Sequence, residues 1–141
     1  MTRFPKDRTW RPPEERSAAG RGAESAVCDH IEAQGFRVMA RNFRGGDGEI
    51  DIVAMDGDTL AFVEVRFREE GRFGRPEETV TFAKRRRIAS AARAYLAKIP
   101  PATWKEARFD VAAVEGGNPE GGGAPVIRYY RGAFDAKGKI L

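Results

Sequence analysis

Four charged side chains stand among apolar residues in the stretch 48–68 of this chain, and they are the first indication of chemistry. They are Glu49, Asp51, Glu64 and Arg66. Burying a charge costs free energy unless the charge is paired or binds a cation. The pattern therefore indicates either a polar face open to water or a site in which these side chains hold a ligand.

The stretch reads as two strands joined by a tight turn, and the turn decides which side chains meet. Gly57-Asp58 has the Gly-X pattern of a two-residue type II′ loop. With this loop, Asp51 lies opposite Glu64. Glu49 then lies opposite Arg66, and side-chain alternation puts all four on one face. Because a three-residue loop would separate Asp51 from Glu64, this prediction depends on the even-numbered loop.

Electrostatic magnitudes say when such a patch needs a ligand. Two carboxylates roughly 5 Å apart repel by about 3 kcal/mol at an effective dielectric of about 20, and by under about 1 kcal/mol in water. If the patch is solvated, it is only the polar face of a hairpin. If it is half-buried, folding requires a proton or a divalent cation between Asp51 and Glu64. Oxygen ligands of this kind suit Mg²⁺ or Mn²⁺.

The chain as a whole reads as one soluble domain. Its 141 residues are 41% hydrophobic and 33% charged, which is typical of a globular protein with a real core. We predict a flexible N-terminal tail at 1–20, a single domain at 21–135 and a C-terminal tail at 136–141. The chain has one cysteine, Cys28, and one histidine, His30. This composition excludes disulfide frameworks, Cys-type metal sites and Ser-His-Asp or Cys-His catalysis. No segment has transmembrane length, so we expect a cytoplasmic protein without a membrane partner, and a homodimer is among the open oligomeric states.

Charge is distributed unevenly along the chain. The segment 47–65 has six acidic and no basic residues, whereas 66–108 has twelve basic and five acidic residues. An acidic pocket beside a basic surface suits a cation held against a polyanion such as a nucleic-acid backbone. A solvated basic helix face is the alternative explanation. The residues expected to contact nucleic acid are Arg72, Arg85, Arg86, Arg87 and Arg93.

Hydrophobic periodicity predicts an α/β domain with a mixed central sheet flanked by helices. The elements expected around the hairpin are a helix at 21–34, a strand at 36–42, a helix from Pro76 to about 98, and strands at 108–114 and 126–130. The glycine-rich stretch 44–48 is expected as a flexible approach to the hairpin. Four consecutive basic residues, 84–87, lie inside the second helix, so at least one must point toward the sheet. Glu24 is either a helix-start acid favoured by the helix dipole or a further carboxylate that reaches the patch.

These motifs resemble those of a known group of enzymes. Asp51, twelve residues, and then Glu64-Val65-Arg66 resemble the PD-(D/E)XK nuclease signature, with Arg where that superfamily usually has Lys. More specifically, the chain resembles the YraN-like family of predicted endonucleases over about residues 20 to 135. The matching stretches are 22–24 (GAE), 41–44 (RNFR), 48–51 (GEID), 62–65 (FVEV), 73–74 (FG), Lys84 with Arg87, 108–111 (RFDV) and 133–134 (AF).

The resemblance implies a restriction-endonuclease-like core, similar to that of Holliday-junction resolvases. It also implies metal-assisted hydrolysis of DNA phosphodiester bonds with Mg²⁺ or Mn²⁺ as the cofactor. In that case Asp51 and Glu64 hold the metal, and Glu24 assists from the first helix. Arg66 falls where the catalytic lysine belongs.

The arginine leaves three hypotheses open, because arginine stays charged and can clamp a phosphate but cannot act as a base. Arg66 can stabilise charge while the metal activates the water, Lys84 can supply the missing amine, or catalysis can be lost while nucleic-acid binding remains. Two rival functions therefore stand beside a nuclease. One is a non-catalytic nucleic-acid-binding module of the same fold, and the other is a protein-interaction domain that uses Tyr129, Tyr130 and the tail.

Overall fold

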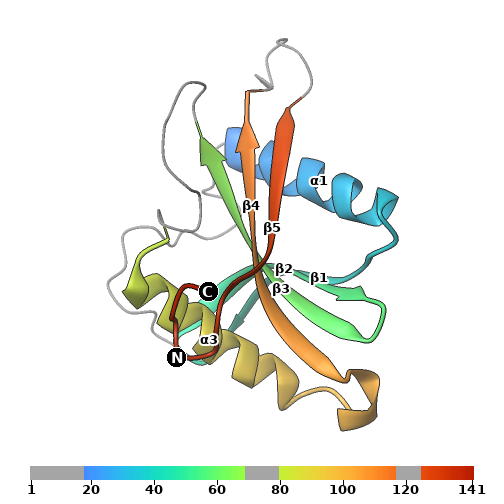
Figure 1. Ribbon diagram of the computed structural model, residues 1–141, viewed down its shortest axis with the longest axis vertical. Helices are drawn as coiled ribbons and strands as arrows, with labels where there is room; N and C mark the ends of the chain where they lie inside the picture. The colour runs from blue at the N-terminus through green and yellow to red at the C-terminus, as the bar shows by residue number, and fades with distance from the viewer. Residues whose placement is uncertain (1–17, 69–79, 117–124) are drawn as a thin grey trace.

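The computed structural model describes residues 18–68, 80–116 and 125–141 (Figure 1). The N-terminal residues 1–17, Arg72 and the start of the predicted second helix lie outside the described residues. The described elements, in chain order, are α1 (Ala18–Ala33), β1 (Arg37–Gly45), β2 (Gly48–Asp56), β3 (Thr59–Arg68), α3 (Phe82–Leu96), the short 3-10 helix η2 (Pro101–Thr103), β4 (Glu106–Glu115) and β5 (Val126–Phe134). Among the described residues, no helix is long and apolar enough to cross a bilayer.

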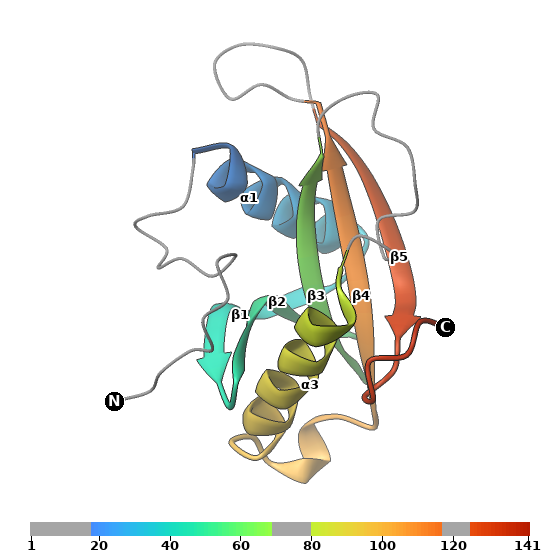
Figure 2. The same cartoon turned by 90° about the vertical axis from the view of Figure 1, so that its left-hand side faces the viewer.

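The strands form one mixed sheet in the order β1-β2-β3-β4-β5. All neighbouring pairs are antiparallel except β3 and β4, which are parallel and are separated in the chain by α3. A parallel pair needs such a crossover, whereas the other pairs need only turns or short loops. Figures 1 and 2 show the sheet strongly twisted, with α1 and α3 on its two sides. This arrangement confirms the predicted α/β fold class and agrees with a restriction-endonuclease-like core.

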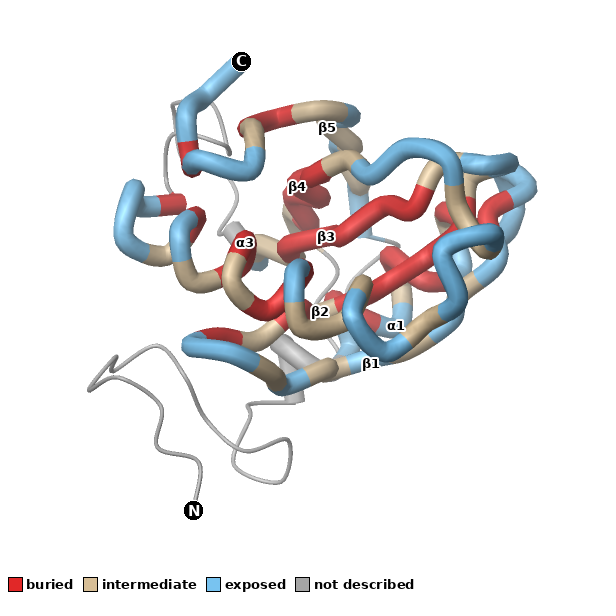
Figure 3. Tube along the Cα trace, turned by 90° about the horizontal axis from the view of Figure 1, so that it is seen from below, coloured by how far each residue is buried: buried red, intermediate tan, exposed pale blue. Residues whose placement is uncertain are grey.

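Two hydrophobic clusters, one on each face of the sheet, form the core. The cluster under α1 contains Ile52, Ala54 and Val63 of the central strands, and the cluster under α3 contains Val53 and Phe62. Because neighbours in sequence enter opposite clusters, β2 and β3 are covered on both faces. The trace of β3 is accordingly buried over residues 60–64 (Figure 3). The strands that carry Asp51 and Glu64 therefore run through the core of the molecule.

The hairpin between β2 and β3 has the predicted loop and register. Gly57 has a φ of 62°, whereas Asp58 is not among the described residues with positive φ, as a type II′ turn requires. The strands pair from Asp56↔Thr59 to Ile52↔Val63. Asp51 and Glu64 are the next residues beyond this ladder, so the prediction that they converge is confirmed.

The turn between β1 and β2 is tight and packed, not the flexible approach expected at 44–48. Gly45 pairs with Gly48, which leaves a two-residue turn. A Cβ added at Gly48 would lie 2.4 Å from the carbonyl oxygen of Arg87, so only glycine lets α3 approach this closely. The backbone N–H of Asp47 also donates to Ser90 Oγ of α3 at 3.0 Å. The turn thus fixes α3 against the beginning of β2.

The last six residues, assigned to a tail from the sequence, fold back along the end of β5. Ile140 forms an isolated bridge with Phe134, and the N–H of Leu141 donates to the carbonyl of Ala133 at 3.1 Å. The carbonyl of Gly138 accepts a 2.6 Å hydrogen bond from Nε of Arg85. Residues 136–141 are therefore part of the packing around α3.

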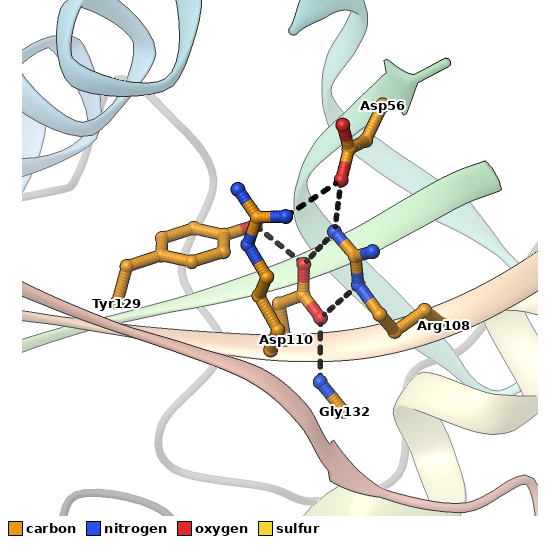
Figure 4. Close-up of polar contacts among 6 residues, drawn as sticks. Asp56, Arg108, Asp110, Tyr129 and Gly132 are labelled. Atoms are coloured by element: carbon orange, nitrogen blue, oxygen red, sulfur yellow. Dashed lines mark hydrogen bonds and ion pairs between the residues drawn. The ribbon is translucent and has the colours of Figure 1, made fainter. Parts of the chain in front are cut away.

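A buried polar network ties β2 to β4 and β5 (Figure 4). Asp110 is fully buried, and its two carboxylate oxygens accept four hydrogen bonds. The donors are Arg108 Nε at 2.8 Å, Arg108 Nη2 at 3.0 Å, the Tyr129 hydroxyl at 2.6 Å and the Gly132 N–H at 2.9 Å. Arg108 also donates to Asp56 at the end of β2 at 3.0 Å. The network therefore spans β3 and holds its neighbours in place.

Removing the acceptor of this network should destabilise the fold strongly. Asp110→Ala leaves Arg108 half-buried without its main partner, and such a loss typically costs about 3–5 kcal/mol. Tyr129→Phe removes one hydrogen bond and should cost about 1–2 kcal/mol. Urea denaturation of both variants checks this order. A smaller loss in Asp110→Ala than in Tyr129→Phe would contradict the central role of Asp110.

The same network should make stability depend on alkaline pH. Burial and the negative charge of Asp110 raise the pKa of Tyr129 above its ordinary value of about 10. A group with a raised folded pKa contributes full stability below its unfolded pKa and loses that contribution as pH rises toward the folded value. The free energy of unfolding should therefore fall above about pH 10, and the fall should be shallower in Tyr129→Phe. Equal slopes in the two proteins would refute this coupling.

Candidate active site

The candidate site lies where β2 and β3 separate. Beyond Ile52↔Val63 the ladder ends, and the Asp51 side chain occupies the position of the next rung. Its Oδ2 accepts a 2.8 Å hydrogen bond from the backbone N–H of Val65. The Glu64 carboxylate lies close enough to raise the pKa of Asp51 by its charge. The strand ends thus bring the two acids close together.

Glu64 is the buried centre of the site. Its side chain is only 2% exposed, and Oε2 lies 2.8 Å from Nζ of Lys84 and 4.0 Å from Nη1 of Arg66. Oε2 nevertheless has no well-aligned hydrogen-bond donor among the residues that the structure describes. The carboxylate is therefore neutralised by a cation at short range but keeps an oxygen that another ligand can use.

The three charges set one another's protonation. Burial and the charge of Glu64 raise the pKa of Asp51 well above its ordinary value. Burial alone would raise the pKa of Glu64, but the charge of Lys84 and the hydrogen bond with Asp51 outweigh it and lower that pKa. Burial would likewise lower the pKa of Lys84, but Glu64 and Asp51 together raise it. The site thus favours the charged forms of Glu64 and Lys84, which form an ion pair, and disfavours a second negative charge on Asp51.

Helix α3 delivers Lys84 from its first turn. Thr81 caps the helix, and its hydroxyl accepts the N–H of Lys84 at 3.1 Å. Among the four consecutive basic residues, Lys84 points to the carboxylates, and Arg85 is buried and donates to the carbonyls of Val80 and Gly138. This confirms that at least one of the four faces inward.

The predicted nucleic-acid contacts divide into two groups. The prediction that Arg85 contacts nucleic acid is corrected. Its guanidinium is buried and donates to the carbonyls of Val80 and Gly138, so Arg85 holds α3 against the C-terminal segment. Arg86 and Arg93 are exposed on α3, and Arg87 is partly exposed. Arg72 lies outside the described residues.

The neighbours of Glu49 differ from expectation. Glu49 lies opposite Arg44 of β1, not opposite Arg66, because β2 leaves β3 before reaching that point. Arg44 was not predicted as a neighbour, although the Gly-X pair at 46–47 is the same turn signal as Gly57-Asp58.

Glu24 is buried on α1 at 5% exposure. In the described part of the chain no group of three or more acidic, His or Cys side chains is placed to hold a metal ion. The assisting role of Glu24 stays a prediction.

The residues of the protein-interaction hypothesis are engaged inside the domain. The Tyr129 hydroxyl is bound to Asp110, and its ring makes an edge contact with Phe36 at a centroid distance of 5.8 Å. Tyr130 is partly buried against the α3-side core. Both tyrosines are therefore partly used in the packing of the domain.

The donor set of Asp51 and Glu64 fits a hard divalent cation. Magnesium sites are commonly built from one or two carboxylates completed by water and substrate phosphate. A buried Glu64 oxygen without an aligned donor, next to an acid whose pKa is raised by burial and by the charge of Glu64, meets that description. The two carboxylates can therefore accept a cation.

The Glu64–Lys84 ion pair gives a test of this electrostatic arrangement. Lys84→Met leaves a buried carboxylate without its nearest cation and should cost about 3 kcal/mol, the lower end of the range because Lys84 is partly exposed. Glu64→Gln in the same chain should recover most of that loss, since no charge then remains to be compensated. Urea denaturation of the two single variants and the double variant, in EDTA, measures the coupling. Additive losses would show that the two charges do not depend on each other.

Comparison with known proteins places the chain in a family. A family model described as "Uncharacterised protein family UPF0102" matches residues 23–114. A UPF0102 protein of Symbiobacterium thermophilum is 47% identical over 105 residues, which cover 72% of this chain and 85% of the relative. One from Pseudomonas entomophila is 36% identical over 124 residues, covering 88% of this chain and 98% of the relative. The chain therefore belongs to the UPF0102, or YraN-like, family.

Proposed function

We propose that this protein is a metal-dependent nuclease that hydrolyses phosphodiester bonds of DNA. The observation that carries the proposal is the buried Glu64 carboxylate, in contact with Asp51 at the point where two central strands separate and 2.8 Å from Lys84. A fold needs no such group for stability, because an apolar residue at this position would avoid the cost of burying charge. Perturbed carboxylates with a specific charge partner are typical of functional sites.

Asp51 and Glu64 would hold the Mg²⁺ or Mn²⁺ ion. When bound, the ion supplies Lewis-acid chemistry at the scissile phosphate and at the attacking water. The chain's own residues then position the substrate. Lys84 is the nearest cation to Glu64 and would stabilise the charge that develops on the phosphate. Arg66, farther away at 4.0 Å and partly exposed, would clamp a phosphate oxygen in the role of the usual lysine.

Exposed basic side chains support a polyanionic substrate. Arg86 and Arg93 are exposed on the side of α3 opposite Lys84, and Arg44 lies opposite Glu49 on the edge strand β1. Basic side chains of this kind bind phosphate backbones without regard to sequence. We therefore expect DNA binding that weakens as salt increases.

A catalytically impaired DNA-binding module is the second candidate, and Arg66 is the observation that favours it. Arginine cannot give up its proton to activate a water, as a lysine can. The two functions differ in their need for metal. Binding alone should persist in EDTA and in Asp51→Asn, whereas cleavage should not.

Cleavage of supercoiled plasmid and of a four-way junction tests the proposal. Wild type should cut with Mg²⁺ or Mn²⁺ and not with EDTA, and Glu64→Gln and Asp51→Asn should be inactive because each removes a metal-binding charge. Lys84→Gln should lower the rate by about 10²-fold through the loss of charge stabilisation. Arg66→Lys should retain or raise activity.

The control is Arg128→Gln, which removes an exposed arginine on β5 whose partner is Glu115. It should cut like wild type. Metal-independent DNA binding without cleavage in wild type and in Arg66→Lys would replace the nuclease with the binding module. Full activity in Glu64→Gln would contradict the site itself.

A further inference from the structure

Asn42 has an unusual backbone conformation. Its φ is 53°, and among the described residues it is the only non-glycine residue with a positive φ. This left-handed region is unfavourable for residues with a Cβ, although asparagine tolerates it better than most. A conformation of this kind inside a strand persists only where the surroundings impose it.

The position of Asn42 in the sheet connects it to the candidate site. In the β1–β2 ladder Arg41 pairs with Ile52 and Phe43 pairs with Ile50. Asn42 therefore occupies the register position directly opposite Asp51. The strained residue and the candidate metal ligand are cross-strand neighbours.

The alternation of β2 is broken at Asp51. Ile50 and Val53 both belong to the core cluster under α3, whereas Ile52 belongs to the cluster under α1. In a regular strand, residues three apart point to opposite faces. One residue between Ile50 and Val53 is therefore outside the alternation, and since Ile52 faces α1, that residue is Asp51. Its carboxylate accordingly points along the sheet toward β3, where it accepts the N–H of Val65.

The alternation of β1 is broken at the matching position. Ala40 and Phe43 both pack against the core under α3, whereas Arg41 donates to Ser25 of α1. Asn42 is therefore the residue outside the alternation of β1. Because each strand carries one such residue at the same rung, the register of the ladder is the same on both sides of it.

We propose that Asn42 is a positioning residue for Asp51. The left-handed backbone of Asn42 takes this one residue of β1 out of the side-chain alternation. Because β2 departs from alternation by one residue at the same rung, the two strands keep their pairing register. The hairpin register places Asp51 beside Glu64, and the departure of β2 from alternation takes the Asp51 carboxylate off the sheet face so that it accepts the N–H of Val65. With a regular β1, either Phe43 would leave the core under α3 or the two strands would lose their pairing. The part of this inference that concerns metal rests on the proposed function.

Substitutions at Asn42 separate the backbone from the side chain. Glycine removes the amide group but adopts positive φ freely, whereas a β-branched residue opposes it. Asn42→Gly should therefore behave like wild type, and Asn42→Val should not. Asn42→Ala is a milder variant to use if Asn42→Val does not fold. Arg37→Val is the control, because it places the same residue at an exposed, regularly paired position of the same strand.

Hydrogen exchange of the Val65 amide is the first readout, measured by NMR in EDTA. The Asp51 hydrogen bond should keep this amide slow in wild type, Asn42→Gly and Arg37→Val, and fast in Asn42→Val and Asn42→Ala. Manganese affinity, measured by calorimetry, is the second. It should fall by about tenfold or more in Asn42→Val, as for other residues that orient metal ligands.

The outcomes distinguish the inference from the proposed function. A protected Val65 amide in both Asn42→Val and Asn42→Ala would overturn the inference, and so would an equal loss of protection in Asn42→Gly, which would assign the role to the amide side chain. Wild type that binds no manganese while the Val65 amides follow the expected order would refute the proposed metal site and leave the positioning role of Asn42 supported.

Discussion

The buried charge of Glu64 is the constraint on which the surrounding structure depends. A carboxylate at 2% exposure has to be compensated at short range, and here the compensation comes from Lys84 at 2.8 Å. Lys84 can reach it only if the first turn of α3 lies close to the sheet. That closeness in turn requires Gly48, where any side chain would meet the backbone of α3. The buried charge of Glu64 therefore accounts for the ion pair with Lys84, for the position of α3 and for the glycine at position 48.

The sheet is irregular beside the candidate site, and a polar network holds it at the opposite end of β2. The paired departures from alternation at Asn42 and Asp51 redirect a carboxylate without changing the strand register. The opposite end of β2 is held by the Arg108–Asp110 network, which reaches Asp56 across β3. The distortion at Asn42, which costs free energy, can persist because the packing on both faces and the polar network hold the strands that carry it.

The sequence predicts the elements and the meeting of Asp51 with Glu64, because a Gly-X turn sets a hairpin register and the register sets the neighbours. It does not predict the turn of Asp51 out of alternation, since a positive φ at a non-glycine residue leaves no periodic signal. Periodicity does not say which of four consecutive basic residues meets the carboxylate, and Lys84 was singled out only through the family resemblance. The burial of Arg85 depends on Gly138, which is distant in sequence and closes over α3 only in the folded chain.

Asp51 and Glu64, as proposed, form a site for a divalent cation. This site can be examined in a crystal of the full chain soaked in Mn²⁺, with diffraction recorded near the manganese absorption edge. We expect one anomalous peak within bonding distance of oxygens from both carboxylates, at about 2.0–2.3 Å as for hard cations of this size. A structure in which Lys84 still contacts Glu64 at full occupancy and no peak lies between the two acids would contradict it.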